Sequence, residues 1–507
     1  MIFNSSLQAI DRILKKSLGN MKAFLLFLIY IVFSDGIIAQ CNCGPLPPPG
    51  TGETVIYADN TAEVQQAIGN ANGKTTIYLN SGTYPVSSSS LINVFKPDIT
   101  IRSASGNRDD VIIQGEGMAA GGGVGHGIFI DADNITVADL TVRDVQNHAF
   151  FVNPGADSCL FHNVRGLDSG EQIFKASGDP ALPPKNHGII ECSTFEYTTT
   201  LDDGDDGYYT QGIDLLNCHN WIIRDNVIRN IKHNPSLTST LAGPAILSWY
   251  QSSNTIVERN KIIECDFGIS FGNSAQGTIS HTGGIIRNNF ILGYAYSDFG
   301  IGLAFAPDAK VINNTIYSPG GWPYSIEARF AETTNCEITN NFSDEDIWDN
   351  RDGASCTLTT NNTAATPSDF VNIAVCDLHL KSNAVTAINA GTNTPERTMD
   401  IDCEDIISLP DIGADEFDST YAVLGMNNHD SHNEVSIYPT LCKGIITIEG
   451  QNIRQVILLD INGQVRKIIP CDWEQITAID ISKEVKGIYF VKVLTENGIL
   501  IRKIILG

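Results

Sequence analysis

The chain has 507 residues, a formal net charge of −26 at pH 7, and only 18% charged residues. Its length suits two or three domains, and its composition, with 45 glycines, favours all-β structure over coiled coil or disorder. No basic stripe accompanies the negative charge, which excludes a nucleic-acid partner; an anionic substrate would need a local basic pocket or a bridging cation.

A secretory signal peptide is predicted for residues 1–39. Met21-Lys22 begins a positively charged end, residues 23–33 form an apolar core, and Ala39 is a small residue suited to cleavage. Residues 1–20 are interpreted as the product of a start codon assigned too far upstream, with an extended positively charged region as the alternative. No later segment is long and apolar enough to span a bilayer, so we expect no transmembrane segment in the mature chain.

Residues 40–79 are predicted to contain a linker, a short helix and the first strands of a β-rich domain. Residues 40–53 are rich in Pro and Gly and predict a linker. Residues 60–68 predict a short amphipathic helix capped by Asn60 or Thr61. Short β-type runs follow from Thr75 onward.

One sequence motif is then repeated along the chain. It is a short apolar run that ends in Asn, and the copies are spaced by roughly 21 to 34 residues, which is the range of solenoid repeats. Asn tolerates the left-handed conformation needed at a corner, and stacked coils would align these side chains as a hydrogen-bonded ladder. The pattern predicts a parallel β-helix over residues 54–417, with phrases ending at Asn226, Asn260, Asn289, Asn314, Asn341 and, more weakly, Asn361-Asn362.

A second series of short runs lies before each Asn turn. Because side chains alternate faces along a strand, the first column should point into the cylinder and the second outward, on a surface of varied chemistry. On this alignment Lys175 falls in an inward column, beside Ile130, Val152 and Leu215. The outward column is predicted to contain Phe129, Phe151, Phe174, Asp214, Leu247, Ser270, Ala304 and Glu327.

The cap helix followed by these coils resembles the right-handed parallel β-helix of the pectin-lyase-like superfamily. The resemblance covers roughly residues 54–417, and residues 409–417 resemble the closing phrase of many secreted β-helix proteins. It implies a fold and no single activity, since the superfamily holds lyases, hydrolases, epimerases and non-enzymes.

Residues 170–175, Gly-Glu-Gln-Ile-Phe-Lys, resemble the chondroitinase B and alginate lyase family. In that family acidic residues just before a lysine hold Ca²⁺, and the lysine takes the proton next to a uronate carboxylate. The resemblance implies Lys175 as the base, with Glu171 and Asp214 positioning the base or the cation. Burial would lower the pKa of Lys175 toward neutrality. The family's arginine one coil later is not matched, and a structural ion pair of Lys175 with Glu171 or Asp214 is the alternative.

The outward face is also expected to bind substrate. Asp214 and Glu327 lie about four coils apart, roughly 19 Å at ~4.8 Å per strand, which is too far for the carboxylate pair of a glycosidase. They are instead expected to frame a groove, with a tryptophan ring that stacks on a sugar. The candidate substrate-binding residues are Trp249, Glu327, Arg329, His148 and Tyr209.

Two further features are a candidate Ca²⁺ loop and a candidate disulfide. Asp202, Asp203 and Asp205 offer oxygen ligands without the spacing of an EF-hand, and a solvated acidic loop is the alternative.

Cys336 and Cys356 each precede a repeat Asn by five positions, so they should stack in adjacent coils and form a disulfide.

The remaining cysteines are assigned by position. Cys376 is expected to pair with Cys403. Four others are expected to be small buried residues inside the β-helix: Cys159, Cys192, Cys218 and Cys265.

Residues 418–433 predict a linker, and residues 434–507 a separate small β-sandwich. The order of Tyr438-Pro439, residues 460–464 and residues 487–489 closely resembles the type A sorting domain of the type IX secretion system. The resemblance implies a Bacteroidota-type cell, the secretion machinery as a partner, and export through the periplasm and across the outer membrane to a secreted or surface-attached state. A carbohydrate-binding β-sandwich is the alternative.

These features together predict a secreted, carbohydrate-active protein made of a right-handed parallel β-helix and a small C-terminal β-sandwich. The predicted activity is a polysaccharide lyase that cleaves a uronate-containing polymer by β-elimination, with Ca²⁺ as the candidate cofactor. A non-catalytic surface protein that binds glycans or partners and a glycoside hydrolase on the same fold are the alternatives.

Overall fold

The computed structural model describes residues 43–417 apart from 88–89, 119–124, 200–209, 237, 274–277, 397–398 and 407–408. It also describes residues 436–506 apart from 439–440, 443, 461–464 and 496–497. The chain divides into two compact units between Phe417 and Asp418. In the described part the regular secondary structure is mostly strand, with one α-helix, α2 (Thr61–Asn70), which confirms the all-β prediction.

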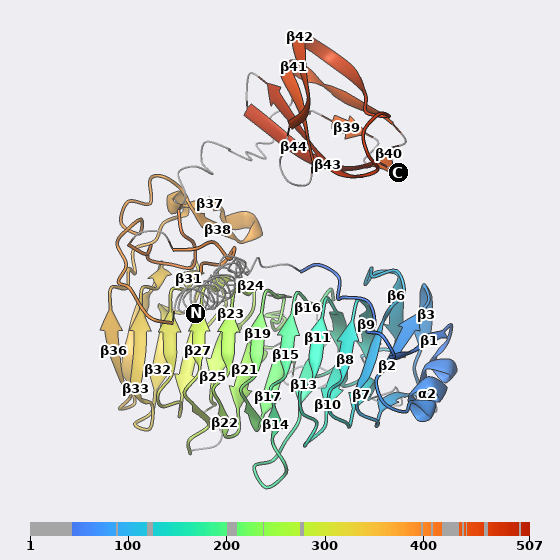
Figure 1. The fold of residues 1–507 in the computed structure, drawn as a ribbon. Helices are drawn as coiled ribbons and strands as arrows, with labels where there is room; N and C mark the ends of the chain where they lie inside the picture. The colour runs from blue at the N-terminus through green and yellow to red at the C-terminus, as the bar shows by residue number, and fades with distance from the viewer. Residues whose placement is uncertain are drawn as a thin grey trace, which may run out of the picture. The chain divides into compact units, whose positions relative to one another are not determined.

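The first unit is a parallel β-helix whose strands stack coil upon coil in three long sheets (Figure 1). The first sheet contains β1 (Thr54–Ala58), β2 (Thr75–Leu79), β5 (Ile99–Ser103), β8 (Thr136–Ala138), β11 (Leu160–His162), β15 (Ile189–Glu191), β19 (Ile222–Arg224), β23 (Ile256–Glu258), β27 (Ile285–Arg287), β30 (Lys310–Ile312), β33 (Thr334–Thr339) and β36 (Ser355–Thr359). The second sheet contains β4 (Ile92–Val94), β7 (His126–Ile130), β10 (His148–Val152), β13 (Phe174–Ala176), β17 (Ile213–Leu216), β21 (Pro244–Trp249), β25 (Phe267–Phe271), β29 (Ile301–Ala304), β32 (Tyr324–Arg329) and β35 (Asp346–Arg351).

The third sheet closes each coil. It contains β3 (Gly82–Pro85), β6 (Val111–Gln114), β9 (Thr141–Val145), β12 (Arg165–Ser169), β16 (Thr194–Glu196), β20 (Val227–Arg229), β24 (Lys261–Ile263), β28 (Phe290–Leu292), β31 (Thr315–Tyr317) and β34 (Phe342–Ser343). A short fourth sheet lies between the second and first sheets along the chain, with β14 (Lys185–Asn186), β18 (Cys218–His219), β22 (Ser252–Ser253) and β26 (His281–Thr282).

The Asn ladder predicted from the repeated phrase is confirmed. Each side-chain amide donates to the side-chain oxygen of the next Asn at 2.9 to 3.0 Å, along Asn226, Asn260, Asn289, Asn314, Asn341 and Asn361. The left-handed residue at each corner is the one before the ladder Asn, as at Asp225 (φ 58°) and Arg259 (φ 54°). The Asn side chain is thus turned inward, where it satisfies buried backbone groups that the corner leaves without partners.

The second sheet differs from prediction at two coils. Phe174 pairs with Phe150 and Ile213 in the inward column, and it is fully buried. Lys175 therefore lies in the outward column, in register with Phe151 and Asp214, so the prediction of an inward Lys175 is wrong. A one-residue shift in a strand exchanges its two faces. A second difference lies near the C-terminal end, where Gly302 pairs with Glu327 in place of Ala304. These two positions are two residues apart, so they lie on the same face of the strand.

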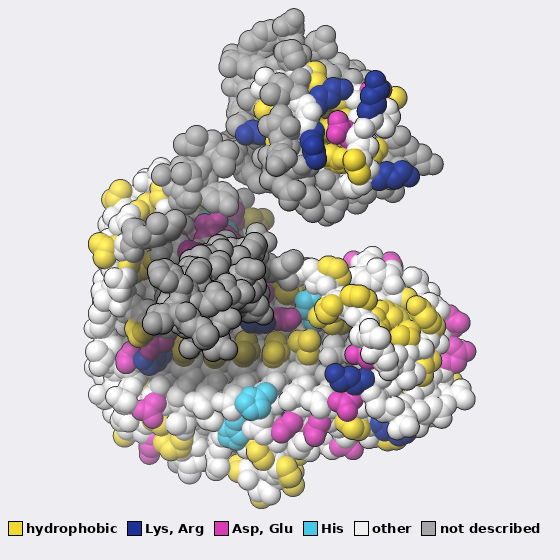
Figure 2. Space-filling view, in the orientation of Figure 1, with side chains coloured by type: hydrophobic (Ala, Val, Ile, Leu, Met, Phe, Trp, Pro, Cys, Tyr) yellow, Lys and Arg dark blue, Asp and Glu magenta, His cyan; other side chains and the backbone are white. Residues whose placement is uncertain are grey.

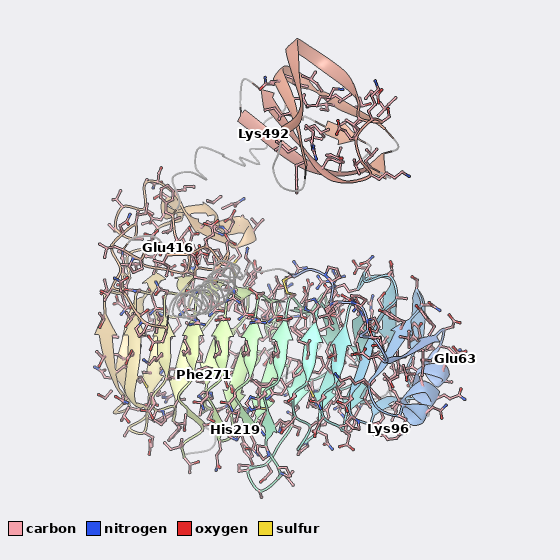
Figure 3. The ribbon with its side chains drawn as sticks, in the orientation of Figure 1. Glu63, Lys96, His219, Phe271, Glu416 and Lys492 are labelled. Carbon is pink, nitrogen blue, oxygen red and sulfur yellow. A yellow bond between two sulfur atoms is a disulfide. The ribbon has the colours of Figure 1, made fainter. Side chains whose placement is uncertain are left out.

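The N-terminal end of the β-helix is covered by α2. The Asn60 side chain accepts the Glu63 backbone N–H at 3.0 Å, and the Glu63 carboxylate accepts from the Asp59 N–H at 2.8 Å, a reciprocal N-terminal cap. Val64 and Ile68 are buried on the first coils. At the other end of the helix, Lys96 donates to the Gly69 carbonyl at 2.6 Å (Figure 3).

The C-terminal end is closed by residues 367–417. This segment includes the hairpin of β37 (Phe370–Asn372) and β38 (Asp377–Leu380), with the short 3₁₀ turns η2 (Pro367–Asp369) and η3 (Ile373–Val375). It binds back onto the last coils, because Asn313 donates to the Asp411 carbonyl at 3.0 Å and the Ala414 N–H donates to Thr315 at 2.9 Å.

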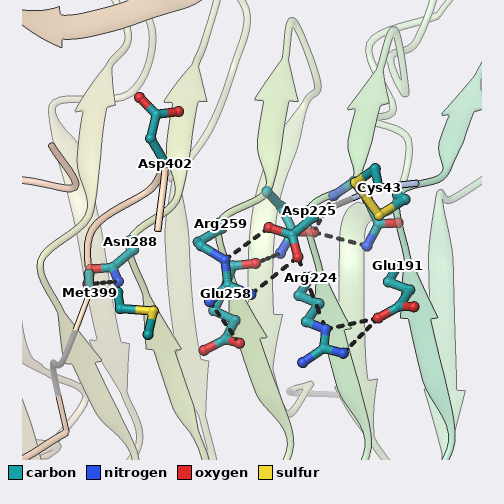
Figure 4. Close-up of polar contacts among 12 residues, drawn as sticks. Cys43, Glu191, Arg224, Asp225, Glu258, Arg259, Asn288, Met399 and Asp402 are labelled. Carbon is teal, nitrogen blue, oxygen red and sulfur yellow. Dashed lines mark hydrogen bonds and ion pairs between the residues drawn. A yellow bond between two sulfur atoms is a disulfide. The ribbon is translucent and has the colours of Figure 1, made fainter. Parts of the chain in front are cut away.

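A ladder of ion pairs runs along the first sheet (Figure 4). Arg224 Nη2 lies 2.7 Å from Glu191 Oε2, Arg259 Nε 2.8 Å from Asp225 Oδ1, and Arg287 Nη2 2.6 Å from Glu258 Oε2. The face shown in Figure 2 is mainly uncharged surface with charged side chains in small groups, in keeping with the low charged fraction.

The cysteines correct several expectations. Cys336 and Cys356 do pair in register, but both are free thiols joined by a hydrogen bond that lowers the pKa of Cys336, so the predicted disulfide is not formed. Strand stacking at ~4.8 Å brings the thiols into contact without requiring a covalent bond. Cys192, expected as a free buried residue, forms a disulfide with Cys43.

Of the other cysteine predictions, one is wrong and three are confirmed. Cys376 is a free buried thiol whereas Cys403 is disulfide-bonded, so the two do not pair with each other. Cys159, Cys218 and Cys265 are free and buried, as predicted.

The second unit is mainly antiparallel, with β40 (Leu441–Cys442) and β44 (Gly498–Leu506) as a parallel pair, and it has its own core. Its other strands are β39 (Ser436–Tyr438), β41 (Ile445–Asp460), β42 (Val465–Asp480) and β43 (Gly487–Thr495). The first part of β41 pairs with β39 and its last part with β43. Buried residues such as Ile448, Leu458 and Val491 fill the interior, which confirms the small β-sandwich.

Candidate functional site

The outward column of the second sheet carries the chemistry of the first unit. Two polar groups stand on it, here called the Lys175 cluster and the Glu327 groove. Lys175 and Glu327 are five strand steps apart, which is about 24 Å at ~4.8 Å per step. In register the column reads Phe129, Phe151, Lys175, Asp214, Leu247, Ser270, Gly302, Glu327 and Trp348.

The centre of the Lys175 cluster is an ion pair at the sheet surface. Lys175 Nζ lies 3.1 Å from Asp214 Oδ2 and donates to Gln172 Oε1 at 3.1 Å. The Asp214 side chain is only 2% exposed, and its other oxygen accepts the Trp249 indole N–H at 2.8 Å. Burial raises the pKa of Asp214, while Lys175 and the Trp249 hydrogen bond act in the opposite direction. The predicted association of Lys175 with Asp214 is therefore present.

A second group lies one coil away from this pair. His148 Nδ1 lies 2.9 Å from the Gln172 carbonyl oxygen, and a carbonyl only accepts, so the neutral ring carries its proton on Nδ1 and a lone pair on Nε2. Nε2 lies 3.5 Å from Glu171 Oε2, and Asn147 donates to the other Glu171 oxygen. Burial, together with the nearby Lys175, holds the pKa of His148 well below its usual value.

Aromatic rings border the same cluster. His126 stacks on His148 with ring centroids 5.1 Å apart and on Phe151 at 4.4 Å, and Phe129 stacks on Phe151 at 5.1 Å. Burial lowers the pKa of His126 to about 4. The rings form an uncharged platform beside Lys175, and flat surfaces of this kind pack against sugar rings.

The cluster does not fit a Ca²⁺ ion. Ca²⁺ takes six to eight oxygen ligands, and among the described residues beside Lys175 only Glu171 offers a carboxylate that is not already bound to the lysine. The described residues contain one group of three metal-capable side chains, His379, Asp402 and Asp415, and it lies in the C-terminal closing segment. The Ca²⁺ ion expected beside Lys175 therefore has no matching set of ligands among the described residues there.

The Glu327 groove lies further along the second sheet and has a volume of about 480 Å³. Glu327 Oε2 lies 2.5 Å from Arg351 Nη1, and Arg329 Nε lies 2.5 Å from Asp352 Oδ2. Glu327 and Arg329 both line this groove, but the expected groove that also includes Asp214 and Trp249 is not found among the described residues. Neither Asp214 nor Trp249 is among its lining residues, which include Gln211, Leu247, Ser270, Asp298, Phe299 and Trp322.

Asp298 belongs to the site and was not singled out from the sequence. It precedes β29 in a loop, outside the repeated runs, so the periodicity that reveals Glu327 gives no signal for Asp298. The other candidates, Tyr209 and the acidic residues Asp202, Asp203 and Asp205, lie outside the described residues.

The coils and the C-terminal unit define the class of protein, an exported right-handed parallel β-helix protein. Residues 126–282 match the family model described as a right-handed β-helix region. Residues 436–507 match the secretion system C-terminal sorting domain. The chain therefore carries a type IX sorting domain, which implies export and either secretion or attachment at the cell surface. In the described residues no helix is long and apolar enough to span a membrane.

Solved structures resemble the chain at low identity. An alginate lyase from Paenibacillus sp. str. FPU-7 is 16% identical with a TM-score of 0.42, over 61% of this chain and 99% of that one. The pectate lyase Pel9A is 14% identical with a TM-score of 0.46, over 75% and 99%. The family 6 polysaccharide lyase Pedsa3628 from Pseudopedobacter saltans is 13% identical with a TM-score of 0.38, over 62% and 94%. No curated protein matches the sequence. At these scores the likenesses carry no argument about activity.

Proposed function

We propose that the protein is an exported polysaccharide lyase that cleaves a uronate-containing polymer by β-elimination at the Lys175 cluster. The observation that carries the proposal is the amine of Lys175, held on the outward face between Gln172 and the buried carboxylate of Asp214. The neighbouring aromatic rings and the Trp249 indole border the place where a sugar would lie.

The pair is proposed to supply the base of the reaction. In the proposed step Lys175 acts as a neutral amine after passing its proton to the Asp214 carboxylate 3.1 Å away, an acceptor whose pKa is raised by burial. That amine removes the proton on C5 of the uronate. The C4=C5 double bond forms as the C4–O4 bond breaks, and the new ammonium of Lys175 gives its proton to the departing oxygen. Lysine then returns to its starting state.

The charge around Lys175 favours a uronate whose carboxyl group is esterified. Asp214 and Glu171 place two carboxylates beside the amine, and within the described residues the cluster contains no arginine. A free uronate would therefore be repelled, whereas a methyl ester carries no charge and still acidifies C5. Within pectins we expect the methyl-esterified polymer to be cleaved at least about 10-fold faster than its demethylated form, a difference of about 1.4 kcal/mol in barrier.

The proposal is tested by the ultraviolet absorbance of the unsaturated product. The mature protein is incubated with alginate, chondroitin, ulvan, and pectin in both esterified and demethylated forms. Lys175→Met, which keeps the length of the side chain without the amine, should lower elimination by at least about 100-fold. Lys74→Met is the matched control, because Lys74 is exposed and lies away from the second sheet. No absorbance with any polymer, or equal turnover of the two variants, would refute the assignment.

A further inference from the structure

We propose that the Glu327 groove is a second catalytic site, which hydrolyses a glycosidic bond with Asp298 as the acid and Glu327 as the base. The site is separate from the Lys175 cluster, and its chemistry does not depend on the lyase proposal.

The groove has the size and lining of a carbohydrate site. Its volume of about 480 Å³ lies in the range of small-molecule pockets, roughly 300 to 1,000 Å³. Trp322, 36% exposed, stands in the lining together with Phe299 and Phe330. The Phe299 ring lies across the sheet because position 302 is glycine; a Cβ there would be 2.5 Å from that ring.

One lining atom also lacks a partner. The side-chain oxygen Oε1 of Gln211 is buried and accepts no hydrogen bond in the described structure. A buried acceptor without a donor is costly by about 1–3 kcal/mol. A sugar hydroxyl in the groove would supply that donor.

The two carboxyl groups stand in different environments. Glu327 is buried and forms an ion pair with Arg351. Asp298 forms no ion pair among the described residues. Burial raises its pKa and the charge of Glu327 adds to that rise, whereas the hydrogen bond from the Phe299 backbone N–H and the charges of Arg351 and Arg329 lower it. Two carboxyl groups whose surroundings differ in this way can divide the roles of acid and base.

The reaction is a hydrolysis. Asp298 gives its proton to the glycosidic oxygen as the bond from that oxygen to the anomeric carbon breaks. Glu327 takes a proton from a water molecule whose oxygen bonds to the same carbon. The sum is the addition of one water across the glycosidic bond, and the proton on Glu327 returns to Asp298 through solvent.

The test is made in the Lys175→Met variant, so that elimination does not contribute. New reducing ends are measured without an ultraviolet signal on alginate, pectin, arabinan, mannan and laminarin. Hydrolysis of at least one polymer is expected, and adding Asp298→Asn or Glu327→Gln should lower it by at least about 100-fold. Asp346→Asn, an exposed carboxylate on β35, is the control and should leave the rate unchanged.

A chemical rescue separates catalysis from structural support. Azide is a small anion that can attack the anomeric carbon without a base. It should therefore restore cleavage by Glu327→Ala with a glycosyl azide as the product, and none by Asp298→Ala. Because a glycosyl azide is not a reducing end, this rescue is measured as the loss of polymer size. Absence of new reducing ends on every polymer, or an equal loss in Asp346→Asn, would overturn the second site. Either result would leave the lyase proposal standing, because that proposal is read from the absorbance of the protein with Lys175 intact.

Discussion

The carboxylate of Asp214 shows how single residues tune the proposed site. It is nearly fully buried and has two donors of different kinds, the charged amine of Lys175 and the neutral indole of Trp249. Both donors favour the ionised form, and burial opposes it. Trp249 therefore contributes through a hydrogen bond to a buried charge and not only through its ring surface.

Replacing Trp249 with Phe should separate these contributions. The ring is retained, but the hydrogen bond to Asp214 is lost, which should destabilise the fold by about 1.5–3 kcal/mol and raise the pKa of Asp214 further. Urea denaturation of the β-helix measures the first effect. Trp322→Phe is the control, because Trp322 is partly exposed and makes no side-chain hydrogen bond in the described structure; we expect a change of less than about 0.5 kcal/mol. Equal losses in the two variants would contradict the role of the indole N–H.

For single residues, the sequence predicts most side chains of the outward column of the second sheet, but not the position of Lys175. Asp214, Leu247, Ser270 and Glu327 are confirmed because strict alternation holds in their strands. At the start of β13 two consecutive residues, Ile173 just before the strand and Phe174 in it, are both fully buried. The chain bends between them, so a rule of alternating faces assigns one of them to the wrong side and moves Lys175 with it.

The Asn ladder is the element that fixes the stacking of the coils. Asn289 donates to the Val257 and Arg287 carbonyls at 3.0 and 2.9 Å, and its oxygen accepts from the backbone and side chain of Asn260. Each of these groups is buried away from water. The ladder is thus a chain of hydrogen bonds in which each member satisfies its neighbours.

Asn289→Ala should consequently destabilise the β-helix by about 3 kcal/mol or more, because several buried backbone groups lose their partners and each costs about 1–3 kcal/mol. The measurement is the urea midpoint with the slope of the transition. Asn383→Ala is the matched control; Asn383 is exposed and makes one side-chain hydrogen bond, to the Ser368 carbonyl. A comparably small effect in both variants would show that the ladder does not contribute to stability.

The closing segment at the C-terminal end of the β-helix is held by a histidine among carboxylates. His379 Nδ1 lies 2.5 Å from Asp377 and Nε2 2.8 Å from Asp402. Burial lowers the pKa of His379, but the hydrogen bonds to Asp377 and Asp402 and the charge of Asp415 outweigh it and raise the pKa to about 10. A histidine whose pKa is raised on folding stabilises the folded state below its ordinary pKa, and this stabilisation is lost as the pH rises through the folded value.

The stability of the β-helix should therefore fall between about pH 6.5 and about pH 10, by an amount of the order of 2 kcal/mol after solvent screening. Thermal unfolding followed across this range measures the loss. His379→Gln should flatten the pH profile, while His219→Gln should not, because burial lowers the pKa of His219 and places its titration outside the range. A wild-type profile that is flat over the whole range would contradict the proposed link.

At the scale of the whole molecule, the repeats of the sequence were sufficient to predict the β-helix, and the resemblance of residues 434–507 to a sorting domain indicated the small β-sandwich. Repeats of this kind are local, so the sequence of each coil predicts the strands and corners of that coil. The disulfide between Cys43 and Cys192 joins residues 149 positions apart, outside the repeat register. Long-range contacts that no periodicity encodes, such as this bridge and the placement of Asp298, could not be predicted from one sequence.

The two units should separate by function as well as by structure. Each has its own hydrophobic core, so deletion of residues 418–507 should leave the thermal midpoint of the β-helix unchanged and its elimination activity intact. Export should be lost, because the sorting domain is the part that matches the secretion system family. Cell fractionation with the absorbance assay in each fraction measures both outcomes. A fusion of residues 418–507 to a reporter protein that carries its own signal peptide is the reciprocal control and should be exported. If the shortened chain still reached the medium at the full rate, the C-terminal unit would not be the export signal, and its β-sandwich would require another role.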